Sequence, residues 1–120
     1  MKYFIRFYII LFFSYLSAAD INIPSDYSSI QEGINAANEG DVISVSEGIY
    51  YENIELVKNN ITLVGAGLGR TVIDAQGKLF GISVRISEVV QNSHISGFTI
   101  INADNAGINV NSGIGCCNAS

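Results

Sequence analysis

Five charged or ionisable side chains lie beside the short apolar runs of this sequence, where they could take part in chemistry. Asp74 and Asp104 could supply the two carboxylates that glycosidases hold about 5 to 10 Å apart. Arg70 and Arg85 could bind an acidic sugar or remove a proton, and His94, the single histidine, could act as a general base. Turn Asp residues usually bond to the local backbone, however, and isolated surface charges and a lone His are usually structural. We therefore assign no catalytic or metal-ligating residue.

A glycine-rich segment, Gly65–Arg70, follows one of the apolar runs and invites comparison with a phosphate-binding loop. The dinucleotide fingerprint needs a third Gly at the position of Arg70 and a helix after it, whereas 71–73 has the pattern of a strand. Gly supplies the positive φ angles that a tight corner needs. The segment therefore predicts a turn, and we expect no cofactor site.

Cys116 and Cys117 are adjacent, and a disulfide between neighbours would strain the intervening peptide. In an exported chain they could pair with cysteines elsewhere, or one could be buried and the other exposed. Zinc is unsupported without further ligands at suitable spacing. The redox state of both thiols stays open.

Two tripeptides fit the acceptor pattern for N-glycosylation, one beginning at Asn60 and one at Asn118. The fold and function predicted below do not depend on a sugar at either residue.

Residues 1–19 predict a secretory signal peptide. Lys2 and Arg6 precede an apolar core at 7–13, and the small residues 17–19 predict cleavage before Asp20. The apolar core is shorter than the roughly 20 residues that span a bilayer, which favours cleavage over a membrane anchor. We expect a secreted or cell-envelope protein with no membrane span after signal removal.

The mature chain is strongly acidic. Without Lys2 and Arg6, four basic residues remain against 11 acidic ones, so the formal net charge changes from −5 to −7. This charge repels nucleic acid and anionic membranes. A polyuronate ligand would therefore need local Lys or Arg side chains, or a bridging cation.

Residues 20–40 predict an N-terminal cap that contains one amphipathic helix. Ser28 and Gln31 have the spacing of a capping box. Three apolar residues fall on one helical face, and Gly40 is expected to end the helix in a left-handed conformation. The residues of that face are Ile30, Ile34 and Ala37.

Residues 41–120 predict the first coils of a solenoid. The tetrapeptide Gly81–Val84 recurs 26 residues later as Gly107–Val110, and we expect Ile82 to stack on Ile108 and Val84 on Val110. No two-residue hairpin signal joins the short runs, so neighbouring strands should turn corners rather than fold back. The predicted strands are 42–45, 54–56, 61–64, 72–73, 82–86, 98–100 and 108–110. Asn is frequent, as at Asn92, Asn102, Asn105, Asn109 and Asn111, and Asn side chains that stack at corners would have a structural role.

Taken together, the segments 23–34, 40–54, 61–65 and 71–74 resemble the N-terminal portion of right-handed parallel β-helix proteins of the pectin lyase-like superfamily. The resemblance implies an all-β solenoid whose first helix caps the open end of the coil. It also implies a catalytic cluster on later coils, with Ca²⁺ as a cofactor if the protein is a lyase. The tail 113–120 resembles the turn of a further coil, so we expect the chain to be truncated.

Three functions remain open. The first is an exported β-helix module that binds polysaccharide or another cell-surface component, or is structural there, without catalytic residues in this segment. The second is the N-terminal part of a polysaccharide lyase or glycoside hydrolase whose active site lies downstream. The third is an accessory envelope protein that handles copper, although the sequence has no cluster of soft-metal ligands. We rank them in that order. The ligand and the oligomeric state stay open.

Overall fold

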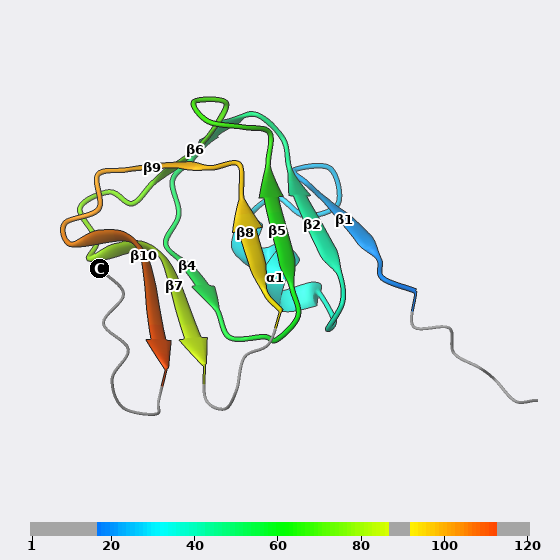
Figure 1. Cartoon of the computed structure of the whole chain (residues 1–120). Coiled ribbons are helices and arrows are strands. Elements are labelled where there is room, and N and C mark those ends of the chain that lie inside the picture. The colour runs from blue at the N-terminus through cyan, green and yellow to red at the C-terminus, as the bar shows by residue number, and fades with distance from the viewer. Residues whose placement is uncertain (1–16, 87–91, 113–120) are drawn as a thin grey trace, which may run out of the picture.

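The computed structural model describes residues 17–86 and 92–112. In this part of the chain, one short helix lies among ten strands (Figure 1). The elements are β1 (Asp20–Ile23), α1 (Ile30–Ala36), β2 (Val42–Val45), β3 (Gly48–Tyr50), β4 (Ile54–Leu56), β5 (Thr62–Gly65), β6 (Thr71–Asp74), β7 (Phe80–Ile86), β8 (His94–Ser96), β9 (Thr99–Ile101) and β10 (Ala106–Ser112).

The strands form three parallel sheets, and each coil of the chain adds one strand to each sheet. Sheet A has the order β1-β2-β5-β8, sheet B the order β3-β6-β9 and sheet C the order β4-β7-β10. The first coil is β2-β3-β4, the second β5-β6-β7 and the third β8-β9-β10, as Figure 1 shows. The predicted parallel β-solenoid is confirmed, and the described strand pairs are all parallel.

The register between coils agrees with the tetrapeptide repeat. Ile82 pairs with Ile108 and Val84 with Val110, as predicted, and Ile54 continues the first of these stacks into the first coil. The inward side chains of these strands are fully buried where a coil covers them on both sides, so Ile82 is 0% exposed. Each such Ile contributes roughly 1.5 to 3 kcal/mol of burial free energy. These stacks make up the core.

Three strands were not predicted from the sequence: β1, β3 and β8. Each has only three or four residues and is held by parallel pairing with a strand of a neighbouring coil. The sequence suggested a corner at His94, but this residue begins β8 and pairs with Thr62 of β5. A strand this short is fixed by the neighbouring coil rather than by its own composition.

Helix α1 covers the beginning of the solenoid, as predicted, with Ile30, Ile34 and Ala37 buried. Both predicted helix ends are wrong. The N-cap is Ser29, whose side chain accepts from the backbone N–H of Glu32, whereas the Ser28 hydroxyl donates to the Glu32 carboxylate. The C-cap is Ala37, so the helix ends before Gly40. Gly40 does take a positive φ of 94°, but it lies in the turn that leads into β2.

Side chains of the first coil hold both ends of α1. The Glu52 carboxylate accepts hydrogen bonds from the backbone N–H groups of Ile30 at 3.0 Å and Gln31 at 3.1 Å. At the other end, Lys58 Nζ donates to the carbonyls of Asn35 and Ala37, both at 2.6 Å. A carboxylate at the N-terminus and an ammonium at the C-terminus each satisfy backbone groups that a helix leaves unpaired. The two contacts therefore fix the helix to the coil.

Gln31 connects α1 to the edge of sheet C. Its side-chain Oε1 accepts from the Glu55 N–H at 2.8 Å, and its Nε2 donates to the Glu55 carbonyl at 3.1 Å. Because β4 is the edge strand of sheet C on this side, the amide of Gln31 takes the place of a neighbouring strand. The backbone of Glu55 is thereby held in place.

Asp41 fixes the entry into β2. One carboxylate oxygen accepts from the Ala19 N–H at 2.9 Å and the other from the Asn38 N–H at 2.7 Å. The side chain is buried, with 4% exposed. The bonds from Asn38 and Ala19 hold the pKa of Asp41 below its ordinary value of 3.8.

Asn residues take left-handed conformations at the corners of the coils. Asn60 has φ 54°, Asn92 has φ 70° and Asn102 has φ 54°. Asn tolerates this region better than most residues. The Asn102 amide donates to the Asp74 carboxylate of the coil below at 3.0 Å, so in this case the partner is an acid rather than another Asn.

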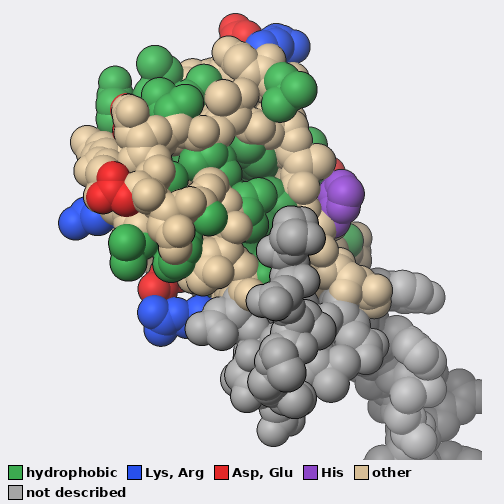
Figure 2. Space-filling model, turned by 60° about the vertical axis from the view of Figure 1, so that its left-hand side comes forward, with side chains coloured by type: hydrophobic (Ala, Val, Ile, Leu, Met, Phe, Trp, Pro, Cys, Tyr) green, Lys and Arg blue, Asp and Glu red, His purple; other side chains and the backbone are tan. Residues whose placement is uncertain are grey.

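The end of the solenoid formed by β8, β9 and β10 faces the viewer in Figure 2, with hydrophobic side chains in the middle of the ring. Within the described residues no strand covers this side of β10, and Ile108 and Val110 are 46% and 58% exposed. No helix in the described ranges has the length and apolar composition to cross a membrane.

Candidate functional site

The outer face of sheet C carries a groove with a volume of about 500 Å³. This lies within the range of roughly 300 to 1,000 Å³ that ligand pockets usually have. All three coils contribute to its lining, which consists of Asn53, Ile54, Glu55, Lys78, Leu79, Phe80, Ser83, Arg85 and Asn109.

A row of polar side chains crosses the groove from coil to coil. Glu55 of β4 pairs with Ser83 of β7, and Ser83 pairs with Asn109 of β10. Glu55 and Ser83 alternate with the buried Ile54, Leu56 and Ile82, so their side chains point outward, and Asn109 stands in register with Ser83. A carboxylate, a hydroxyl and an amide therefore lie one strand spacing apart, about 4.8 Å. Together they offer donors and acceptors for several hydroxyl groups of a bound sugar.

Two cations adjoin this row. Arg85, two residues after Ser83 on the same face, pairs with Glu55 at 3.4 Å. Both partners are more than half exposed, so the pair contributes little to stability and can exchange for a ligand group. Lys78 lines the groove two residues before β7 and has no ion-pair partner among the described residues. The groove thus has one acidic and two basic side chains in a chain that is acidic as a whole.

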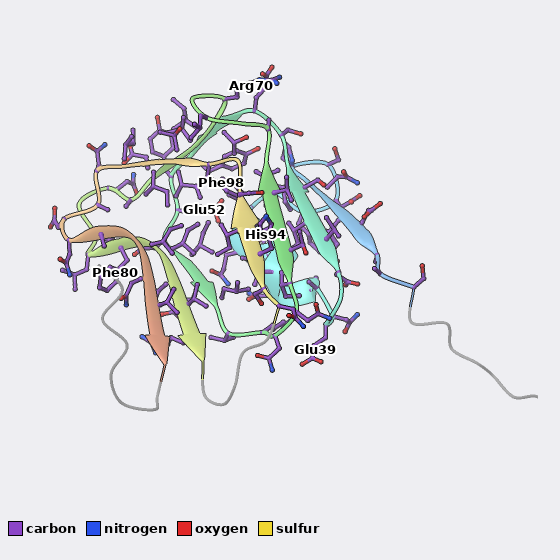
Figure 3. The ribbon with its side chains drawn as sticks, in the orientation of Figure 1. Glu39, Glu52, Arg70, Phe80, His94 and Phe98 are labelled. Atoms are coloured by element: carbon purple, nitrogen blue, oxygen red, sulfur yellow. The ribbon has the colours of Figure 1, made fainter. Side chains whose placement is uncertain are left out.

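Apolar side chains form one end of the groove. Leu79 is 63% exposed, and Phe80 lies beside it at the start of β7, where Figure 3 labels it. The Asn53 side-chain amide donates to the Phe80 carbonyl and holds this corner to the first coil. A partly exposed aromatic ring beside polar groups can pack against the apolar face of a sugar ring.

Of the side chains that the sequence suggested for chemistry, the structure brings only Arg85 into the groove. Arg70 forms an exposed ion pair with Glu47 at 3.0 Å, at the corner between sheets A and B. In Figure 3, Arg70 and His94 lie well apart from Phe80. His94 is exposed at the start of β8.

The two Asp candidates do not come together with a base. Asp74 ends β6, where its carboxylate accepts from the Gln76 N–H at 2.9 Å and from the Asn102 amide. This confirms the local role expected of Asp74. Asp104 is exposed in the turn before β10, where its backbone N–H donates to the Lys78 carbonyl at 2.9 Å.

The glycine-rich segment forms a corner, as predicted. Gly67 and Gly69 have φ angles of 131° and 73°, and strand β6 follows directly. Cys116, Cys117 and the pattern at Asn118 lie outside the described residues, as does most of the predicted signal peptide. In the described ranges, no three His, Cys, Asp or Glu side chains gather as a metal site would require.

Most of the groove residues were not singled out from the sequence. A signal for the polar row was nevertheless present, because the predicted stack of Ile82 on Ile108 also places Ser83 beside Asn109. If Ile54 is also placed below Ile82 in the same stack, Glu55 joins the polar row. Lys78 and Leu79 lie in the turn before β7 and Phe80 is its first residue, and no periodic pattern in the sequence indicated them.

The described part of the chain is a parallel β-solenoid with one short helix, and part of the sequence is similar to pectinesterases. Over 58 residues it is 38% identical to probable pectinesterase/pectinesterase inhibitor 17 of Arabidopsis thaliana, a match that covers 47% of this chain and 11% of the relative. Over 56 residues it is 43% identical to putative pectinesterase/pectinesterase inhibitor 38 of the same plant, which covers 40% of this chain and 12% of the relative. A comparison with protein-family models gives no match.

The matched part of the chain thus spans about a tenth of the length of these relatives. Weak homology over part of the chain and the parallel coiling together confirm the resemblance to the pectin lyase-like superfamily. The described residues therefore form a β-helix module with partial sequence similarity to pectinesterases.

Proposed function

We propose that this chain is an exported module that binds an acidic polysaccharide in the groove on sheet C. The observation that carries the proposal is the local charge of the groove. Arg85 and Lys78 provide the cations that a polyuronate needs if it is to approach an acidic chain. The partial similarity to pectinesterases supports a pectin-related ligand.

The arrangement supports binding rather than glycoside hydrolysis. Among the described residues that line the groove, Glu55 supplies the one carboxylate, whereas glycosidases use two. Glu55 is also paired with Arg85, which lets a ligand carboxylate take its place on the guanidinium. Ser83 and Asn109 would bond sugar hydroxyls on either side of that contact. Export through a cleaved leader at residues 1–19 is part of the proposal.

The test compares two exposed Arg residues that both pair with a Glu. Binding of the purified chain to polygalacturonate is measured by isothermal titration calorimetry, with dextran as the neutral polymer. Arg85→Ala should weaken binding about tenfold, because one charge-assisted contact is worth about 1.5 kcal/mol or more. Arg70 lies outside the groove, so Arg70→Ala should bind polygalacturonate with the affinity of the unsubstituted chain. Equal effects of the two changes, or equal affinity for dextran, would refute the proposal.

A second candidate is the N-terminal part of a pectin-modifying enzyme whose active site lies on other coils. The similarity to pectinesterases favours it and points to an esterase in addition to the lyase and hydrolase expected from the sequence. Methyl-esterified pectin is incubated with the protein, with and without Ca²⁺. Release of methanol, of reducing ends or of an ultraviolet-absorbing unsaturated product would establish the enzyme and its reaction type.

A further inference from the structure

The corner between β4 and β5 presents an Asn side chain to solvent. Asn60 is exposed, with a φ of 54°. Its backbone carbonyl accepts from the Gly40 N–H at 2.7 Å, so the main chain is fixed here. Within the described part of the chain, its carboxamide makes no hydrogen bond. Neither the core nor the groove uses this side chain.

The two residues after Asn60 complete an acceptor pattern for an N-linked sugar. Ile61 is fully buried, while Thr62 is half-buried and lies on the outer side of sheet A, opposite to the buried Leu63. The alternation therefore places Asn60 and Thr62 outside and Ile61 inside. The core is built without either of the two side chains that the modification requires.

We propose that Asn60 is an N-glycosylation site. This inference rests on the proposed export, because the donor is a polyprenyl-diphosphate-linked oligosaccharide of the secretory pathway. Asn60 Nδ2 forms a bond to the anomeric carbon of the first sugar and loses one proton. The polyprenyl diphosphate is the leaving group, so no oxidant or reductant is needed.

The folded chain has room for the sugar. Even a Cβ built at Gly40 would come no closer than 3.8 Å to Asn60 Nδ2, which is ordinary van der Waals contact, so residue 40 does not obstruct the exposed carboxamide. Asn60 follows the C-terminal end of β4, whereas Leu79 and Phe80 lie at the N-terminal end of the parallel strand β7. A sugar at Asn60 would therefore leave the apolar end of the groove open.

The next coil supplies a matched control. The pairing of Thr62 with His94 places Asn92 above Asn60, and Asn92 is also exposed and left-handed, with φ 70°. The two corners differ at the second residue after the Asn, which is Thr62 in one and His94 in the other. His94 has no hydroxyl group. Asn92 should therefore stay unmodified, and His94→Thr should create a second acceptor in nearly the same geometry.

The full-length chain is secreted from a eukaryotic host, in a background with Asn118→Gln, and its mass is measured before and after treatment with peptide N-glycosidase. We expect the parent to lose the mass of one oligosaccharide and to contain Asp at position 60 after release. Thr62→Val, which keeps the side-chain shape, should abolish the shift. Asn92→Gln should leave it unchanged, and His94→Thr should double it.

A second form carries the host's own leader, so that export and glycosylation are tested separately. Retention of the native form together with a shifted second form would contradict the proposed export while supporting the site. A secreted, folded parent without a mass shift would overturn the inference. A shift that persists in Thr62→Val would also overturn it, because the sugar would then be attached elsewhere.

Discussion

Loss of the Glu52 carboxylate should loosen the helix that caps the solenoid. Glu52 accepts two hydrogen bonds from the first turn of α1, at 3.0 and 3.1 Å. Glu52→Gln keeps the size of the side chain but turns one acceptor into a donor that faces a backbone N–H. One charge-assisted bond is lost, and one helical N–H is left without a partner.

The magnitude follows from the type of bond and its exposure. A hydrogen bond to a charged group contributes about 1.5 to 3 kcal/mol, and we take about 2 kcal/mol because the site is half-buried. In a domain of roughly 60 to 100 residues, 1 kcal/mol shifts the melting temperature by about 4 to 8 °C. Glu52→Gln should therefore lower the melting temperature by about 8 to 16 °C.

Thermal and urea unfolding, followed by circular dichroism, measure the effect. Glu47→Gln is the matched control, because it makes the same chemical change in a pair whose side chains are 62% and 68% exposed. This control should cost less than about 0.5 kcal/mol. Equal losses in the two variants, or no loss in Glu52→Gln, would refute the assignment of Glu52 as the residue that anchors the cap.

Three further changes test the fold. Folding lowers the pKa of Asp41, so its carboxylate stabilises the folded state above the unfolded pKa, and this stabilisation is lost as the pH falls through the folded pKa. The free energy of unfolding should therefore fall less steeply with acid in Asp41→Asn. Ile82→Ala should cost about 2 to 5 kcal/mol in urea unfolding and Ile108→Ala clearly less, since their exposed fractions are 0% and 46%; similar costs would contradict the stacking. Gln31→Ala should speed hydrogen exchange of the Glu55 amide, and an unchanged rate would contradict the edge contact.

The coiling of the chain could be predicted because its signals are local or repeated. The alternation in 42–45 and 54–56 identifies strands, and the repeat of 81–84 at 107–110 gives the register of Ile82 on Ile108. The helix was predicted from its apolar face. Its exact ends were not, because Ser28 and Ser29 are both good caps and only the surrounding contacts choose between them.

The candidate site could be predicted only in small part. Arg85 stood out as a cation, but the residues that join it in the groove include Glu55 on the first coil and Asn109 on the third. Corners of unequal length separate these residues in sequence. The number of residues in each corner therefore decides which outward side chains become neighbours. No local sequence pattern indicates that number.

By itself, then, the sequence determined that the chain winds in parallel coils beneath a helical cap, because buried side chains must alternate along each strand and recur from coil to coil. The tertiary structure alone decided that Glu52, Gln31 and Lys58 hold the cap, and that Lys78 and Phe80 join Arg85 in one groove. The physical reason is that burial of apolar side chains is encoded by composition and period. Contacts between polar side chains depend on distances between coils, which exist only once the stack has formed.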